Sequence, residues 1–366
     1  MKIIFLIMLI IHGIIHLFGY LKAFKIAKIE NLKIDISKPL GILWLISTLL
    51  FVLSGILLLT ENHFWIIPAA IAVILSQILI VKSWKDAKFG TIPNVIVLIV
   101  IIPAISLFIF KSNVNQEIER IKNIPINENK TIVESEIENL PKSIQLWLKT
   151  SGVIGKKQMN YTKLTQYAKM KMKPEQQDWY EAEAIQFIRN DEPSFVWFVN
   201  LKMMGFIDIY GRDKFENGKG EMLIKIFSLF NIVNSAGDRI DEATMQRYLG
   251  EIIWSPSAAL SKLIRWEEMN EFSARAIMNY KGRKVIGEFY FNPDGDFVRF
   301  RTERYFGSED NAERKIWEIT ARDYKSFDGI RLPSEFDVYW KLGEKEWWNW
   351  MNLKITDIEY NNPGNW

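Results

Sequence analysis

The segment YTKLTQYAKMKM, residues 161–172, alternates along its length and puts Lys169, Lys171 and the following Lys173 on one face. A repeat of two residues is typical of a β-strand with one face in water. Similar segments follow, separated by clusters of Pro, Gly, Asn and Asp: DWYEAEAIQFI, SFVWFVNLK, FIDIYGRDKF and GEMLIKIFSLFNI. The stretch therefore predicts five strands in succession.

A helix interrupts these strands at DEATMQRYLGEIIW, residues 241–254. Acidic residues at its start suit the positive end of a helix dipole, and Pro256 ends it. An apolar stripe runs along one side, made by Met245, Leu249, Ile252 and Ile253. We therefore predict one helix at about 239–255.

Strand patterns then resume in six segments: FSARAIMNY, KVIGEFYF, DFVRFRTERYF, KIWEITARDY, IRLPSEFDVYW and EWWNWMNLKITDIEY. The turns NPDGD, 292–296, and SFDG, 326–329, are strong hairpin signals. About eleven strands with short connections and one helical insertion favour one large, curved antiparallel sheet or open half-barrel with a capping helix.

Alternation also predicts which side chains this sheet buries. The expected buried residues are Phe272, Ala274, Ala276, Met278 and Tyr280 in one strand, and Phe336, Val338 and Trp340 in another. SFVWFVNLK, residues 194–202, is apolar on both faces, and FSLFNIV nearly so. Two interpretations stay open: these are central strands, or they line a hydrophobic cavity that the helix closes.

The chain before the sheet has a different composition. Four stretches are apolar over about the 20 residues that a membrane span needs: Ile3 to Tyr20, Leu40 to Leu59, Phe64 to Val81 and Ile92 to Phe110. The first lacks a small-residue cleavage site, so we expect it to be retained rather than removed as a signal peptide. The predicted organisation is an α+β membrane protein: a four-helix transmembrane domain at 1–112, a helical linker at 113–152 and a β domain at 153–366.

The charges of the loops predict the orientation. The first loop holds five lysines and the third holds three, whereas the second holds neither Lys nor Arg. Because positive loops stay in the cytoplasm, we expect both termini and the β domain on the extracytoplasmic side of the cytoplasmic membrane. Basic residues after the fourth span, among them Lys111 and Arg120, weaken this bias.

Two histidines, His12 and His16, lie four residues apart in the first span. They share one helix face and should point at another helix, where Ser54, Ser76 and Gln77 are the available polar partners. We favour a hydrogen-bonded pair between helices. A haem or metal site is the weaker alternative, because no cysteine and no further histidine or carboxylate lies in the spans to complete it.

The segment DAKFGTIPN, residues 86–94, has the spacing of an aspartate motif found in membrane prepilin peptidases. That chemistry needs a second carboxylate in a membrane-embedded GxGD segment, and the GD pairs of this chain lie in polar turns. We therefore expect Asp86 to be a solvated loop charge and Pro93 to open the fourth helix.

Four segments together resemble an uncharacterised family of bacterial membrane proteins: HGIIHLFGYLKAF, SWKDAKFGTIPN, GRDKFENGKGEM and RYLGEIIWSPSAAL. That family joins a short membrane bundle to a soluble domain of unknown function. In strand order and helix placement the soluble part is also similar to the half-barrel of periplasmic lipoprotein carriers, which hold acyl chains in a concave sheet. This second likeness concerns architecture alone.

The last of these motifs marks the candidate site. Arg247 and Glu251 are spaced as a helix ion pair, which at a surface would contribute a few tenths of a kcal/mol. Alternatively, Arg247 holds a lipid or carboxylate head group while Tyr248 and Trp254 meet the chain. The full set of predicted ligand-binding residues is Trp197, Arg247, Tyr248, Glu251, Trp254 and Trp340.

Composition narrows the function. The net charge of +3 does not argue for a nucleic-acid partner, and no cysteine is present to form a disulfide or a thiolate site. No cofactor or phosphate-binding motif appears. We expect a non-catalytic, membrane-anchored protein that binds a lipid or other apolar molecule. The alternatives are an interaction module for envelope proteins and an enzyme that uses carboxylates such as Asp208, Asp213 or Glu251.

Overall fold

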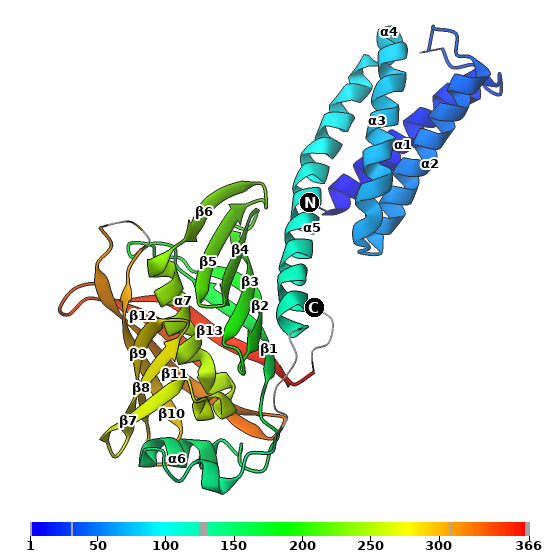
Figure 1. Cartoon of the computed structure of the whole chain (residues 1–366). Coiled ribbons are helices and arrows are strands. Elements are labelled where there is room, and N and C mark those ends of the chain that lie inside the picture. Colours follow the sequence, from blue (N-terminus) through cyan, green and yellow to red (C-terminus); the bar gives the residue numbers. More distant parts are fainter. Residues whose placement is uncertain (1, 31, 124–129, 308, 310, 363–366) are drawn as a thin grey trace. The chain divides into compact units, whose positions relative to one another are not determined.

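The computed structural model describes residues 2–30, 32–123, 130–307, 309 and 311–362. The chain divides into two compact units, Met1–Ile109 and Phe110–Trp366 (Figure 1). The boundary falls inside one helix, α5 (Thr91–Lys122), which begins in the first unit and ends in the second.

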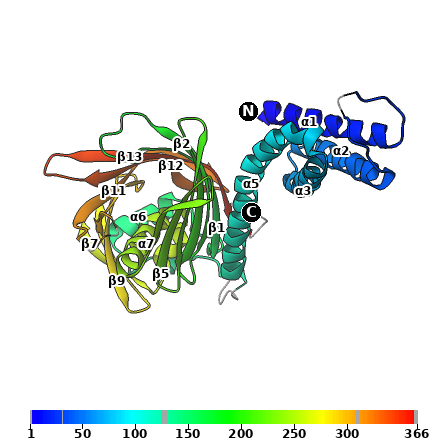
Figure 2. The same cartoon turned by 90° about the horizontal axis from the view of Figure 1, so that it is seen from above.

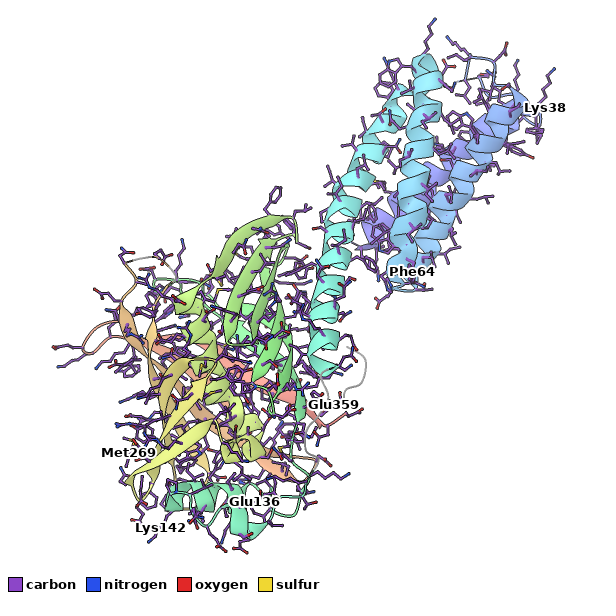
Figure 3. All side chains as sticks on the ribbon, in the orientation of Figure 1. Lys38, Phe64, Glu136, Lys142, Met269 and Glu359 are labelled. Atoms are coloured by element: carbon purple, nitrogen blue, oxygen red, sulfur yellow. The ribbon has the colours of Figure 1, made fainter. Side chains whose placement is uncertain are left out.

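The first unit is a bundle of helices. Its long helices are α1 (Lys2–Ala23), α2 (Lys38–Leu59), α3 (Ile66–Lys82) and the first part of α5, with the short η1 (His63–Trp65), α4 (Trp84–Ala87) and η2 (Lys88–Gly90) in its loops. Among the described residues, four helices are long and apolar enough to cross a membrane, as predicted. Many of their Ile and Leu side chains point away from the bundle (Figure 3). Exposed apolar surface on this scale is typical of helices that face lipid.

The second unit is built on one antiparallel sheet, which confirms the predicted fold class. Its strands are β1 (Tyr161–Met170), β2 (Tyr180–Arg189), β3 (Ser194–Met203), β4 (Ile207–Glu216), β5 (Lys219–Ile226), β6 (Phe230–Ala236), β7 (Ile264–Asn270), β8 (Ser273–Tyr280), β9 (Arg283–Phe291), β10 (Phe297–Tyr305), β11 (Arg314–Phe327), β12 (Ile330–Lys341) and β13 (Trp347–Tyr360). The strand order is β6-β5-β4-β3-β2-β1-β13-β12-β11-β10-β9-β8-β7. The sheet is open, with β6 and β7 at its two edges.

Over the described residues the sheet has 13 strands, two more than the eleven predicted. The prediction joined β5 and β6, because the turn between them is made by Phe227 and Ser228 in the left-handed region, at φ 50° and 58°, where Gly or Asn is the usual signal. It also missed β7, whose sequence IRWEEMN is mostly exposed after its first residue. Neither segment carries the local signal on which a prediction from sequence depends.

The helices of the second unit lie against this sheet. They are η3 (Glu134–Glu136), α6 (Lys142–Thr150), α7 (Asp238–Glu251), η4 (Ile252–Trp254) and η5 (Pro256–Leu260). The sheet curls around α6 and α7 (Figure 2). α7 contacts β4, β5 and β6 near one edge, and also β9 and β10 near the other. The predicted capping helix therefore spans the concave side.

Asp241 fixes this helix to both sides of the sheet. Its carboxylate accepts a hydrogen bond from the backbone N–H of Gly220 at 2.8 Å and pairs with Lys219 at 2.9 Å, both at the start of β5. It also pairs with Arg283 of β9 at 3.1 Å. Asp241 is only 1% exposed, whereas the side chain of Lys219 is 71% exposed, so the pair with Lys219 is open to solvent and salt on its cationic side.

The two apolar faces of β3 have separate partners. Phe195, Trp197 and Val199 belong to the concave core, while Phe198 on the other face meets Phe110 of α5 with ring centroids 5.7 Å apart. Both open interpretations of this strand therefore hold in part, because it is central and one face lines a cavity. The predicted buried residues of the other two strands are buried, except Phe272, which precedes β8 and is 38% exposed.

Candidate functional site

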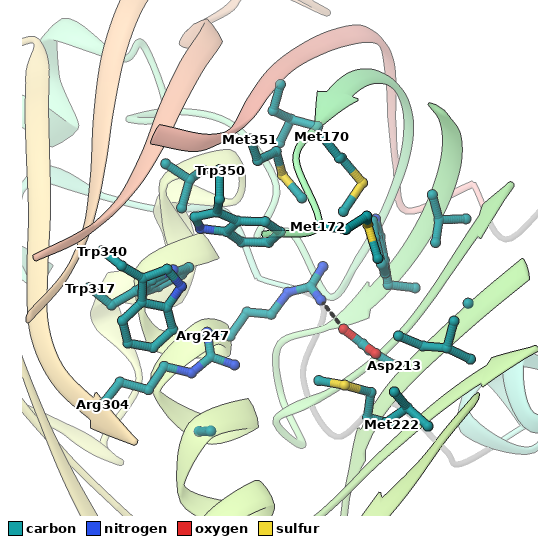
Figure 4. A pocket seen from close by; sticks show the side chains of 18 of the residues that line it. Met170, Met172, Asp213, Met222, Arg247, Arg304, Trp317, Trp340, Trp350 and Met351 are labelled. Atoms are coloured by element: carbon teal, nitrogen blue, oxygen red, sulfur yellow. Dashed lines mark hydrogen bonds and ion pairs between the residues drawn. The ribbon is translucent and has the colours of Figure 1, made fainter. Parts of the chain in front are cut away.

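A cavity of about 440 Å³ lies between the concave face of the sheet and α7 (Figure 4). Five of the six predicted ligand-binding residues line it: Trp197, Arg247, Glu251, Trp254 and Trp340. Tyr248 does not, since its ring packs near Phe215 and its hydroxyl lies 3.4 Å from Asn190. Apolar side chains make up most of the wall. A few convergent polar groups in an apolar pocket are typical of small-molecule sites.

Arg247 is the central charged residue of this cavity. Its Nε donates to Glu251 at 2.7 Å and one terminal nitrogen donates to Asp213 at 2.7 Å. The guanidinium carbon lies 4.7 Å from the ring centre of Trp197, in cation–π geometry. The predicted Arg247–Glu251 pair is present, but it is buried and shared with a third residue. Arg247 is thus held in place, with both carboxylates engaged.

A row of side-chain hydrogen bonds continues from Glu251 into the sheet. Gln186 of β2 donates to Glu251 at 2.6 Å, and Gln166 of β1 donates to Gln186 at 3.2 Å. Trp197 then donates its indole N–H to Gln166 at 2.8 Å. The row joins α7 to three adjacent strands. It satisfies polar groups that would be costly if left unpaired in an apolar interior.

Arg304 is a second arginine in the wall. It extends from β10, with its guanidinium carbon 4.8 Å from the ring centre of Trp317 and 5.9 Å from that of Trp340. Among the described residues, no carboxylate pairs with it and its Nε has no hydrogen-bond partner. Figure 4 shows Arg304 and Arg247 directed into the same space. The cavity therefore contains one paired and one unpaired guanidinium.

The wall also contains indole donors without acceptors. In the described part of the chain, the Nε1 atoms of Trp254, Trp317, Trp348 and Trp350 are buried and make no hydrogen bond. All of these tryptophans line the cavity. These N–H groups therefore lie inside the wall without an acceptor among the described residues, and they are not part of the open surface of the cavity.

The cavity lies wholly within a region that a family model matches. That model, for a family of unknown function named DUF6920, matches residues 138–360. The chain belongs to this family. No curated protein compared with the chain matches it. The cavity-lining residues of the DUF6920 domain run from Gln166 to Leu353. The apolar helices of the first unit lie outside the matched region. The expectation of a family of unknown function is thus confirmed for residues 138–360, and four apolar helices precede this region in the residues that the structure describes.

Burial and neighbouring charges set the protonation of these groups in the DUF6920 domain. Burial opposes the charge on Arg247, but Glu251 and Asp213 outweigh it and raise the pKa of Arg247. Burial raises the pKa of Asp213, against the influence of Arg247, Arg304 and Arg212. The guanidinium of Arg247, 2.7 Å away and charged at neutral pH, favours the ionised form of Asp213.

Arg304 has a depressed pKa. Burial, followed by the positive charge of Arg247, lowers the pKa of Arg304 to about 10. This value still lies well above neutral pH, so Arg304 is positively charged under physiological conditions. An anion beside Arg304 would offset the repulsion between Arg304 and Arg247, and it would accept a hydrogen bond from the guanidinium of Arg304.

Sequence reasoning missed Arg304 and did not connect Asp213 with Glu251. A signal for Arg304 was present: it shares the inward face of β10 with Phe300 and Thr302, so alternation puts an arginine toward the core. For Asp213 the signal was weaker. Arg212, Asp213 and Lys214 are consecutive charged residues of β4, so the sequence does not show which of them points toward the concave side. Asp208, the third suggested carboxylate, does not line the cavity.

The two histidines of the first span lie in a polar network inside the first unit. The Nε2 atom of His12 lies 2.9 Å from Asn94 Oδ1, and that of His16 lies 2.8 Å from Ser76 Oγ. Asn94 also donates to Gln77 at 3.0 Å. Of the predicted partners, Ser76 contacts a histidine, Gln77 joins through Asn94, and Ser54 instead bonds the backbone of Trp65. Asn94 was not predicted.

The segment around Asp86 has a different role from the one expected. Asp86 is not a free loop charge, since its carboxylate accepts backbone N–H groups of Lys33 and Ile34 at the end of the first loop. Pro93 is the third residue of α5, as predicted. The described residues contain no group of three or more His, Asp or Glu side chains suited to a metal ion.

Proposed function

We propose that the DUF6920 domain binds an amphiphile with one anionic head group and an apolar chain. The observation that carries this proposal is Arg304, an unpaired guanidinium in the wall of a largely apolar cavity. In this arrangement the head group accepts hydrogen bonds from the guanidinium of Arg304, which is directed into the cavity (Figure 4). Arg247 is less suited to this role, because Asp213 and Glu251 already balance its charge and occupy two of its N–H groups.

The chain of the ligand would lie along the methionines and tryptophans of the wall. Met170, Met172, Met222 and Met351 line the cavity together with several tryptophans. Methionine side chains are flexible and adapt to irregular shapes. Such a wall suits chains of varying length better than one ligand of fixed shape.

We also propose that the domain lies outside the cytoplasm, attached to a bacterial cytoplasmic membrane by the four apolar helices. The support is the lysine count of the first and third loops. A cysteine introduced at exposed Asn217 should react with a membrane-impermeant maleimide in intact cells. Labelling only after lysis would contradict this orientation.

The head-group assignment is tested with two ligands of equal chain length, a fatty acid and the corresponding fatty alcohol. Full-length protein in detergent should bind the acid more tightly. In Arg304→Gln the affinity for the acid should fall by about tenfold to a hundredfold, since a charge-assisted hydrogen bond contributes about 1.5–3 kcal/mol. The affinity for the alcohol should change little.

Arg299→Gln is the matched control, because Arg299 stands on the same strand and on the opposite face. It should leave both affinities unchanged. Equal binding of the acid by wild type and Arg304→Gln would exclude Arg304 as the head-group site. If neither the acid nor the alcohol binds, and no lipid copurifies, the amphiphile proposal itself is wrong.

A further inference from the structure

Adjacent turns at one end of the sheet expose large apolar side chains. Met204 and Phe206 in the β3–β4 turn are 69% and 59% exposed, and Phe230 after the β5–β6 turn is 65% exposed. Met172, which follows β1, is 39% exposed. These four residues, here called the apolar rim, share one end because β1 to β6 are consecutive antiparallel neighbours. The β5–β6 hairpin forms the upper end of the sheet in Figure 1.

The backbone at these turns is unusual for the residues that form it. Met204, Phe227 and Ser228 have positive φ angles of 53°, 50° and 58°. A non-glycine residue in this region costs on the order of 1 kcal/mol, and Gly or Asn would avoid most of that cost. Met204 and Phe227 are thus large apolar residues at positions that favour Gly or Asn, and Met204 is the member of the apolar rim to which this applies.

α5 enters the second unit at the end of the sheet that carries the rim. At its C-terminal end, Arg120 pairs with Glu216 at 2.7 Å, near the end of β4 away from the rim. Ten residues earlier, Phe110 meets Phe198 and the ammonium of Lys225, both closer to the rim. Followed from Lys122 back to Phe110, α5 therefore advances toward the rim. The chain that precedes Phe110 is the fourth apolar span.

We propose that the apolar rim inserts into the interfacial layer of the bilayer that holds the chain's own spans. The rim carries aromatic and methionine side chains of the kind that enter the boundary between head groups and acyl chains. Exposed Lys202 lies beside it, suited to lipid phosphate. Because the chain enters the domain directly from a span, the bilayer is present at high effective concentration. This inference does not depend on the ligand proposed above, although Met172 belongs to both the rim and the cavity wall.

The absence of cysteine from the chain allows a direct test. Single cysteines replace Phe206, Phe230 or Met269, and each is labelled with an NBD fluorophore in full-length protein reconstituted into lipid nanodiscs. Met269 is the control, an exposed methionine on β7 at the other edge of the sheet (Figure 3). Labels at positions 206 and 230 should show blue-shifted emission and quenching by nitroxide lipids. The label at 269 should be quenched by aqueous iodide instead.

A second variant distinguishes insertion of the apolar rim into the bilayer from a position of the rim close to the bilayer surface. A label at Met204→Cys should become accessible to iodide when Phe206→Asp and Phe230→Asp are added, while intrinsic tryptophan fluorescence reports that the fold is kept. Iodide quenching at 206 and 230 as strong as at 269 would overturn the proposal. So would a label at 204 that stays in lipid despite both aspartates.

Discussion

Arg212 and Asp213 are consecutive on β4, and their side chains leave opposite faces of the sheet. Arg212 pairs with Glu117 of α5 at 3.3 Å on the outer face, and Asp213 pairs with Arg247 of α7 at 2.7 Å on the inner face. A single strand therefore ties the helix outside the sheet to the helix that closes the cavity. A shift of β4 along its axis would disturb both ion pairs together.

Replacing Arg247 by methionine should destabilise the domain strongly. The substitution leaves the carboxylates of Asp213 and Glu251 buried without their cation, and breaking a buried pair in this way costs about 3–5 kcal/mol. Urea unfolding followed by tryptophan fluorescence measures the loss. Arg265→Met removes an exposed pair with Glu267 and should cost at most about 1 kcal/mol. Equal losses in the two variants would contradict the buried network.

The stability of the domain should depend on Glu221 in acid. Burial opposes ionisation of Glu221, but Lys214 and Arg212 outweigh it and lower the pKa of this carboxyl. A carboxylate with a depressed folded-state pKa stabilises the fold above its unfolded pKa, and this contribution is lost as the pH falls through the folded value. Wild type should therefore exceed Glu221→Gln in urea midpoint at pH 7, and the difference should shrink toward pH 3. A constant difference would exclude this linkage.

Filling the cavity should reduce ligand uptake while leaving the fold intact. Met222→Trp adds bulk to a residue of the cavity wall. If the added ring displaces two ligand methylene groups, at about 0.8 kcal/mol each, the affinity for a fatty acid should fall by about tenfold. Met269→Trp, on exposed β7, should not change it. Unaltered binding by Met222→Trp would show that the ligand occupies another place.

Alanine should be poorly tolerated at two glycines that enclose Phe300. A Cβ at Gly287 of β9 would lie 2.2 Å from the Phe300 ring, and one at Gly250 of α7 would lie 2.9 Å from it. Each substitution should destabilise the domain by about 1–3 kcal/mol through overpacking. Gly343→Ala, where the nearest atom is 3.4 Å away, should be nearly neutral. Adding Phe300→Leu should relieve part of the Gly287→Ala loss, in a comparison of thermal midpoints.

The polar network of the helix bundle should contribute modestly. Asn94→Leu removes the partner of His12 and the donor to Gln77. Hydrogen bonds between membrane helices contribute about 0.6 kcal/mol on average, with a maximum near 1.7 kcal/mol. The expected effect is a small decrease in the thermal midpoint of the detergent-solubilised bundle. A loss of several kcal/mol would indicate that the network does more than join helices.

Much of the fold was predictable because its signals are local. Apolar stretches mark the four helices, and alternation with turn residues marks most strands. What could not be predicted depends on contacts distant in sequence. QEIERIK, read as part of a linker, continues α5, and Glu117 within it meets β4 through Arg212. Nothing near residue 117 indicates that a strand about a hundred residues later would lie beside it.

The site was predictable to a similar extent. The helix motif identified Arg247, Glu251 and Trp254 as neighbours, since spacing on one helix fixes their relative positions. Tyr248 was wrongly expected to face the same space, because a step of one residue turns a side chain by about 100° around the helix. Arg304 was not singled out, because its importance lies in lacking a partner. A missing contact leaves no pattern in a sequence.

The open sheet has a mechanical consequence. A closed β-barrel has a radius fixed by its strand number and stagger, so its interior cannot widen without breaking backbone hydrogen bonds. Here the strand order ends at β6 and β7, and α7 bridges the two sides through Asp241, Lys219 and Arg283. The separation of the two sides of the sheet is therefore set by ion pairs between one helix residue, Asp241, and two strand residues. Substitutions at these three positions would change how far the concave side can open.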